Sequence, residues 1–219
     1  EIRNADEANK IVEDLSKNDY VVTQVKVGER IRNTSLPFTT STLQQEASKH
    51  LGFSTLKTMN IAQQLYEGVK IKGKEVGLIT YLRTDSTRAS EQAQEEVRRY
   101  IEESFGKDYI ITKKAKKSSK NSKVQDAHEA IRPTDVEKTP DSIKGFLTRD
   151  QARLYKLIWQ RFVASSMSPV RYETYSTKIA NGDYIFNANS SIVIFEGFLA
   201  VYNMDKEKTP KSHSVHVEQ

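Results

Sequence analysis

Residues 174–188 read Thr-Tyr-Ser-Thr-Lys-Ile-Ala-Asn-Gly-Asp-Tyr-Ile-Phe-Asn-Ala, and this stretch decides the fold. The pair Asn181-Gly182 separates two runs of strand-forming residues, which predicts a hairpin turn between strands over 174–179 and 184–188. A further strand is predicted over 192–202. The carboxyl end of the chain is therefore expected to be β-structure.

The amino end of the chain has a similar character. A short helix is predicted over 5–17, and a strand follows over 20–31, where Val21, Val25 and Val27 alternate with polar residues. Both ends of the chain are therefore expected to contribute strands.

The middle of the chain changes to the spacing of helices. Thr42 is predicted to cap a helix that ends before Gly52, and a second helix is predicted from Thr55 to Gly68. Ser90 is predicted to cap a third helix. Its apolar stripe consists of Ala93, Val97, Tyr100, Ile101 and Phe105.

A fourth helix is predicted from the capping-box spacing of Thr148 and Gln151. Its apolar residues are Leu154, Leu157, Ile158 and Phe162. We interpret this stripe as part of a core rather than as a binding surface, because amphipathic spacing usually means packing.

These elements predict an α+β fold in which strand-rich ends enclose a helical insertion. Residues 1–36 and 168–219 are expected to form a discontinuous arch domain, and 37–167 an inserted, mainly helical domain. A body attached through paired connections can swing as a unit, with prolines at 37 and 169 limiting which residues flex.

Composition sets broad limits on the function. A hydrophobic content of 37% over 219 residues is enough for one sizeable core or two modest ones, and a net charge of +5 is compatible with a polyanionic partner. The absence of cysteine excludes disulfides, thiolate zinc sites and cysteine nucleophiles. No apolar run approaches the ~18 residues that span a bilayer, so no membrane association is expected.

Two polar stretches carry no clear fold signal. Six lysines lie between Lys113 and Lys123, and we interpret this tract as a solvated, mobile insertion rather than a specific DNA contact. The polar stretch from Lys206 to Gln219 is expected to be a poorly ordered end.

The segment over 77–86, Gly-Leu-Ile-Thr-Tyr-Leu-Arg-Thr-Asp-Ser, carries candidate chemistry. If it is an extended strand, Tyr81, Arg83 and Asp85 share one face and bring together a hydroxyl, a cation and a carboxylate. A tyrosine alone is weak evidence, because the chain has ten of them and most tyrosines pack.

Two further segments strengthen this interpretation. Residues 37–48 read Pro-Phe-Thr-Thr-Ser-Thr-Leu-Gln-Gln-Glu-Ala-Ser, and 127–134 read Ala-His-Glu-Ala-Ile-Arg-Pro-Thr. Together with 77–86, these segments resemble type IA DNA topoisomerases in their residues, their order and their spacing. The residue after the tyrosine, Leu82, is similar to that of the bacterial topoisomerase I branch of the family. The topoisomerase III branch usually has proline at this position.

The resemblance implies an isomerase that relaxes negatively supercoiled DNA without ATP. Tyr81 would be the nucleophile that cleaves one DNA strand through a 5′-phosphotyrosine intermediate, and strand passage and religation would follow. Arg83 would stabilise the charge of the transition state rather than pair structurally with Asp85.

The resemblance also implies supporting residues. His128 would line the DNA-contacting side of the site, with Asp85 as a further supporting residue. Arg132 would either contact phosphate or lock the motif by ion pairing, and Glu129 would be structural because an unpaired carboxylate would repel DNA.

Family members bind Mg²⁺ through an Asp-x-Asp-x-x-x-Glu cluster in a separate domain, and that cluster does not occur here. We therefore expect a central fragment of a larger bacterial cytoplasmic, nucleoid-associated enzyme, inactive without its metal-binding domain. The expected partners are single-stranded and negatively supercoiled DNA and the remaining domains of the enzyme. The alternative is that the isolated chain is a noncatalytic single-stranded DNA-binding module.

Overall fold

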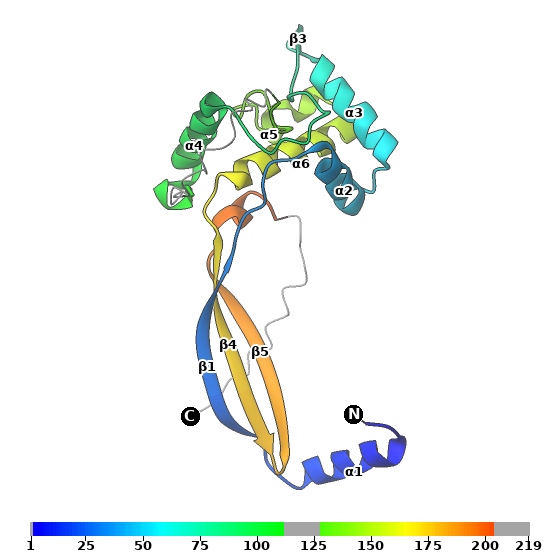
Figure 1. The fold of residues 1–219 in the computed structure, drawn as a ribbon, viewed down its shortest axis with the longest axis vertical. Coiled ribbons are helices and arrows are strands. Elements are labelled where there is room, and N and C mark those ends of the chain that lie inside the picture. Colours follow the sequence, from blue (N-terminus) through cyan, green and yellow to red (C-terminus); the bar gives the residue numbers. More distant parts are fainter. Residues whose placement is uncertain (1, 112–127, 204–219) are drawn as a thin grey trace, which may run out of the picture. The chain divides into compact units, whose positions relative to one another are not determined.

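The structure is a computed structural model that describes residues 2–111 and 128–203, and it confirms the α+β class (Figure 1). The described residues form two compact units. One contains residues 2–32 and 171–195, and we call it the sheet unit. The other contains residues 33–111, 128–170 and 196–203, and we call it the helical unit. The lysine tract at 113–123 and the stretch from Lys206 to Gln219 lie outside the described residues.

The sheet unit consists of one helix and a three-stranded sheet in the order β1-β4-β5. Its elements are α1 (Ala5–Ser16), β1 (Val21–Arg32), β4 (Val170–Asn181) and β5 (Tyr184–Phe195). Strands β4 and β5 are antiparallel. The Thr23 hydroxyl donates to the carbonyl of Lys178, and Gly28 lies against Thr174, so β1 also runs antiparallel to β4.

The predicted hairpin turn is confirmed, and the strands beside it are longer than expected. Gly182 has φ +56°, a value that glycine adopts without steric penalty at the first position of a tight turn. The separate strand expected over 192–202 is wrong, because β5 runs without interruption to Phe195. The chain then turns at Gly197, whose φ is +47°, into a short 3₁₀ helix, η3 (Gly197–Ala200).

The helical unit contains four longer helices and several short elements. The longer helices are α2 (Thr40–Leu51), α3 (Thr55–Glu67), α4 (Glu91–Phe105) and α6 (Arg149–Ser165). The short elements are β2 (Val69–Ile71), β3 (Lys74–Val76), η1 (Lys107–Tyr109), α5 (Pro140–Ile143) and η2 (Lys144–Phe146). Sequence reasoning did not predict the β2–β3 hairpin.

The helix caps follow the sequence with one correction. Helix α2 begins earlier than predicted, because Thr39 is its cap and Thr42 is the third residue of the helix. The Thr39 hydroxyl accepts from the Thr42 N–H (3.3 Å), and the Thr42 hydroxyl accepts from the Thr39 N–H (2.9 Å). Two threonines at this spacing satisfy each other's amides, which favours Thr39 over Thr42. The predicted caps at Ser90 and Thr148 are confirmed.

Helix α6 lies at the centre of the helical unit, where α2, α3 and α5 contact it. Its predicted apolar stripe is buried along its length, so the interpretation of that stripe as core is confirmed. Trp159 is buried as well, and its indole N–H donates to the carbonyl of Val136 (2.9 Å). Within the described ranges, no helix is long and apolar enough to span a membrane.

Candidate active site

The segment over 77–86 is not a strand of a sheet, which corrects the prediction. Its backbone pairing with 128–134 is an isolated bridge between Ile79 and Pro133. Side-chain exposure nevertheless alternates, with Tyr81, Arg83 and Asp85 exposed and the residues between them buried. The common exposed face that extended backbone would produce is therefore present without a continuous ladder.

The segment over 128–134 runs alongside the residues that precede Tyr81. The Thr80 N–H donates to the carbonyl of Arg132 (2.9 Å), and the Thr80 hydroxyl donates to the carbonyl of Ala130 (2.7 Å). One step earlier, the Thr134 N–H donates to the carbonyl of Leu78 (3.0 Å). These bonds fix the backbone directly before Tyr81.

The start of α2 holds the residues that follow Tyr81. The Thr40 hydroxyl donates to the carbonyl of Leu82 (2.7 Å) and accepts from the N–H of Thr84 (2.9 Å). The Thr40 N–H donates to the carbonyl of Thr84 (2.9 Å), and Phe38 pairs with Ile131. All three segments singled out in the sequence therefore meet around Tyr81.

Tyr81 presents its side chain from this fixed backbone. The side chain is 50% exposed, and its ring meets that of Tyr66 edge to face, with 5.4 Å between the centroids. Within the described part of the chain, neither Tyr81, Arg83 nor Asp85 has a side-chain hydrogen bond or ion pair. Arg83 is thus not paired with Asp85, and all three polar groups are accessible to a ligand.

Arg132 is occupied by contacts within its own segment. Its Nε and Nη2 both lie 2.6 Å from the Glu129 carboxylate, and its Nη1 donates to the carbonyl of Pro133 (3.0 Å). The other Glu129 oxygen accepts from the N–H of Ser90, the cap of α4 (3.1 Å). Of the two roles predicted for Arg132, these contacts correspond to ion pairing within the motif. A contact between Arg132 and phosphate stays a prediction. His128 is exposed, and its role also stays a prediction.

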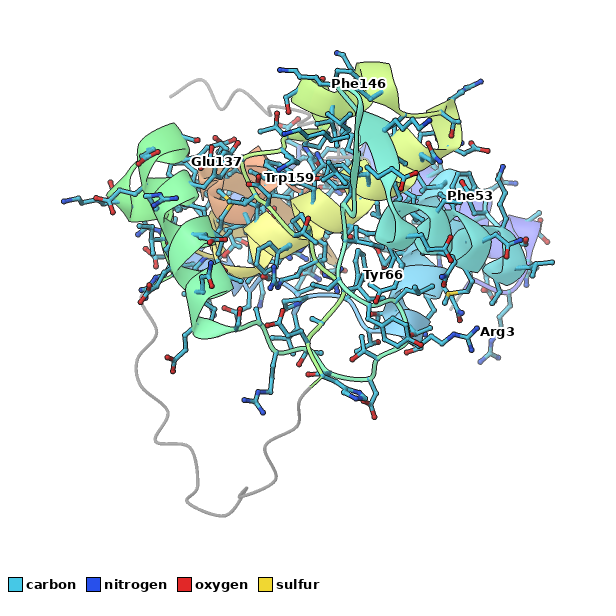
Figure 2. The ribbon with its side chains drawn as sticks, turned by 90° about the horizontal axis from the view of Figure 1, so that it is seen from above. Arg3, Phe53, Tyr66, Glu137, Phe146 and Trp159 are labelled. Atoms are coloured by element: carbon cyan, nitrogen blue, oxygen red, sulfur yellow. The ribbon has the colours of Figure 1, made fainter. Side chains whose placement is uncertain are left out.

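Sequence reasoning missed three residues that shape this site. Thr40 and Thr80 lie inside the segments singled out above, but their uncharged hydroxyls gave no reason to select them. Tyr66 lies outside those segments, near the end of α3, and no sequence signal connected it with Tyr81. Tyr66, which is labelled in Figure 2, belongs to the helical unit, as Tyr81 does.

The described residues do not provide a metal centre. Over 2–111 and 128–203, no group of three or more histidine, aspartate or glutamate side chains is arranged to hold a metal ion.

Comparisons with known proteins identify relatives of the whole chain. Residues 1–219 match the DNA topoisomerase family. The chain is similar to the full-length topoisomerase I of Thermotoga maritima, with 42% sequence identity and a TM-score of 0.80. The match covers 93% of this chain and 32% of that protein, so the chain spans about a third of its length.

Proposed function

The chain belongs to the DNA topoisomerase family, and on that premise we propose that it is the nucleophile-bearing central part of a bacterial type IA enzyme. Such an enzyme relaxes negatively supercoiled DNA by opening one strand, passing another strand through the break and resealing it. The observation that carries the proposal is Tyr81, whose accessible hydroxyl projects from backbone held on both sides by Thr40 and Thr80. Rigid support of this kind is what a positioned nucleophile requires.

The proposed reaction is a transesterification. The Tyr81 oxygen attacks the phosphorus of a phosphodiester in single-stranded DNA, and the new O–P bond joins it to the 5′ phosphate. The bond from phosphorus to the 3′ oxygen breaks, the tyrosine loses its proton, and the 3′ oxygen gains one as a hydroxyl. Religation reverses each step. One ester replaces another, so no ATP is required.

Arg83 is assigned to the phosphate that Tyr81 attacks. It shares the exposed face of the segment and is not engaged by a described carboxylate. A guanidinium can donate two parallel hydrogen bonds to phosphate oxygens, and these strengthen as negative charge accumulates in the transition state. We assign Asp85 and His128 supporting roles on the DNA-contacting side. We assign Arg132 a structural role, because its side chain pairs with Glu129 and its carbonyl accepts from the Thr80 N–H.

Magnesium belongs to the proposal through the family, and the described residues do not fit it. We therefore assign the ion to other parts of the enzyme. Those parts of the enzyme and DNA are the proposed partners of this chain. The proposed location is the bacterial cytoplasm, in association with the nucleoid. In the same proposal the strand-rich part is an arch, and the helical part is the mobile domain that carries Tyr81.

The second candidate function is that of a noncatalytic binding module. In it the isolated chain, which spans 32% of the related protein, binds single-stranded DNA without cleaving it. In that case binding depends on salt and not on the Tyr81 hydroxyl.

The test is to mix the 219-residue chain with end-labelled single-stranded DNA and magnesium, quench with detergent, and look for a covalent adduct. Repeating the reaction with the rest of the enzyme added tests the inactivity of the isolated chain. The adduct is expected only in the second reaction and is expected to disappear in Tyr81→Phe. Tyr20→Phe, which alters another exposed tyrosine, is the matched control. An adduct that persists in Tyr81→Phe would overturn the proposal.

A further inference from the structure

The β2–β3 hairpin concentrates positive charge at one edge of the helical unit. Residues 69–76 read Val-Lys-Ile-Lys-Gly-Lys-Glu-Val, with three lysines against one glutamate. Lys70, Lys72 and Lys74 are all exposed. Their ammonium groups form no hydrogen bond or ion pair with any residue in the described ranges. Three accessible cations in so short a segment favour an anionic ligand over an internal structural role.

The turn of the hairpin has an unusual residue at its tip. Lys72 has φ +49° and is the one non-glycine residue with a positive φ among those described. Gly73 follows with φ +83°, so both central residues of this two-residue turn have positive φ. Turns of this kind favour Asn-Gly, because a lysine in the left-handed region is sterically disfavoured. The backbone therefore does not explain a lysine here, and such outliers often mark functional positions.

An exposed aromatic ring lies on the element next to the hairpin. Strand β2 contacts η2, which ends at Phe146. Phe146 is 43% exposed and lies at the outer edge of the helical unit in Figure 2, whereas Trp159 lies within it. Sites for single-stranded nucleic acid combine cations for the phosphates with aromatic rings on which bases stack.

The base of the β2–β3 hairpin is joined to residues that contact or precede Tyr81. The hairpin begins at Val69, three residues after Tyr66, whose ring contacts that of Tyr81, and it ends at Val76. The Leu78 N–H then donates back to the carbonyl of Leu65 (2.7 Å). At about 3.3 Å per residue, the tip lies roughly 10 Å along the strand from this base. The three lysines therefore lie on a short element whose base is joined to the residues that support Tyr81.

We propose that the β2–β3 hairpin and Phe146 bind the segment of single-stranded DNA that flanks the phosphate attacked by Tyr81. Lys70, Lys72 and Lys74 contact backbone phosphates, and Phe146 stacks on a base. This inference rests on the proposed function, because it takes DNA as the ligand and Tyr81 as the place of attack. Point charges and a stacking ring hold the strand with little dependence on its sequence.

The first test measures affinity of the 219-residue chain for a labelled single-stranded oligonucleotide of mixed sequence over a range of salt concentrations. A triple variant, Lys70→Gln, Lys72→Gln and Lys74→Gln, removes three phosphate contacts. Since each contact contributes about 0.7 to the salt slope for single strands, the slope is expected to fall by about 2, with roughly 10- to 100-fold weaker binding near 0.1 M salt.

A matched triple variant removes the same charge from the sheet unit. It replaces Lys10, Lys26 and Lys178, which are all exposed, by glutamine. Its salt slope is expected to change by well under half as much. Equal weakening by the two triples would overturn the inference, because net charge alone would then explain the loss.

A single substitution separates binding from folding. Lys72→Asn gives the residue that the turn prefers, so the melting temperature is expected to stay level or rise by about 1–2 °C. Affinity is expected to fall roughly fivefold near 0.1 M salt, because one phosphate contact is lost. Phe146→Ala is expected to weaken binding about tenfold with little change in salt slope, since stacking carries no net charge.

The outcomes distinguish this inference from the proposed function. If the unsubstituted chain does not bind single-stranded DNA at low salt, the hairpin inference is overturned, and the proposed function still stands or falls on the adduct assay with the rest of the enzyme added. If it binds and the hairpin triple binds equally well, the hairpin inference is overturned and the role of Tyr81 stands on the adduct assay. Loss of affinity with unchanged circular dichroism is the result that supports the inference.

Discussion

The helical unit and the sheet unit differ most in how much of their own side-chain surface they bury. Helix α6 alone has eight buried residues, and Leu157 in it is 0% exposed. In β1 and β5 of the sheet unit no residue is buried, and Val25 is 53% exposed. Packing within the described residues therefore specifies the helical unit, whereas the sheet is specified mainly by its backbone ladder.

The difference has a geometric cause. A helix needs to bury one stripe, and α6 does so because other helices contact it. A single layer of three strands has two faces and cannot cover either with itself. Several large apolar side chains of β1 and β5 are left exposed: Val21, Val25, Val27, Ile31, Ile185, Ile192 and Ile194. Apolar strands of this kind are typical of a surface that another body covers.

The proposed nucleophile lies on the better-packed unit. Tyr81 is flanked by Leu82, which is buried, and by Thr80, which is bonded to 130–132. A side chain that must be held within a fraction of an ångström needs such a support. The two units thus also differ in that the helical unit carries the proposed nucleophile.

The largest effect is expected from Leu157→Ala at the centre of α6. Removal of a fully buried leucine side chain leaves a cavity and should lower the free energy of unfolding by about 2–5 kcal/mol. Chemical denaturation followed by far-ultraviolet circular dichroism measures it. Leu56→Ala on exposed surface of α3 is the control, with a change within about 0.5 kcal/mol. Similar values for the two variants would break the comparison.

Gly77→Ala should have the next largest effect, because it inserts a methyl group beneath the site. The new Cβ would lie 2.8 Å from the carbonyl oxygen of Tyr66, so backbone has to shift, at a cost of about 1–3 kcal/mol. In the sheet unit, Gly28→Ala meets only the Thr174 hydroxyl at 3.2 Å, and a change within about 0.5 kcal/mol is expected. Denaturation midpoints of the two variants check this, and a larger loss in Gly28→Ala contradicts it.

Alkaline pH should weaken the helical unit through Tyr155, which is buried, and Tyr202, which is partly buried. Burial raises the pKa of Tyr202 to about 12, with Glu46 also raising it and Arg161 opposing, and burial likewise raises the pKa of Tyr155. Folding favours the protonated phenols, so this stability is complete below pH 10 and is lost as pH rises from about 10 toward 12.

Melting temperatures between pH 9 and 12 measure this loss. The pH dependence is expected to flatten in Tyr202→Phe and Tyr155→Phe, because neither ring then titrates. Tyr20→Phe in the sheet unit is the matched control. An unchanged curve in both core variants would show that other groups carry the alkaline transition.

The smallest effect is expected from Val25→Ala in β1. Because the side chain is already exposed, its truncation should change stability by no more than about 0.5 kcal/mol. The same denaturation assay measures it over a range of protein concentrations. A loss of about 1 kcal/mol or more that depends on concentration would show that a second molecule covers this face, and it would break the contrast between the units.

Local signals in the sequence predicted most elements correctly. Capping residues and glycine stops placed α3, α4 and α6, because the groups that begin and end a helix lie within a few residues of its ends. The hairpin at Gly182 was equally local. The β2–β3 hairpin was missed because Lys72-Gly73 lacks the asparagine that usually marks such turns. The segment over 77–86 was taken as a strand, because apolar alternation does not reveal whether a partner strand is present.

The sequence by itself determined the caps at Ser90 and Thr148, the core stripe of α6, and the three segments whose residues resemble those of the topoisomerase family. Only the tertiary structure decided that these segments meet around Tyr81, through Thr40 on one side and Thr80 on the other. It also decided that Arg132 is paired with Glu129 and that Arg83 is accessible. The physical reason is range: caps and stripes are set by neighbours a few residues away, whereas the bonds that hold Tyr81 join residues separated by 42 and 50 positions.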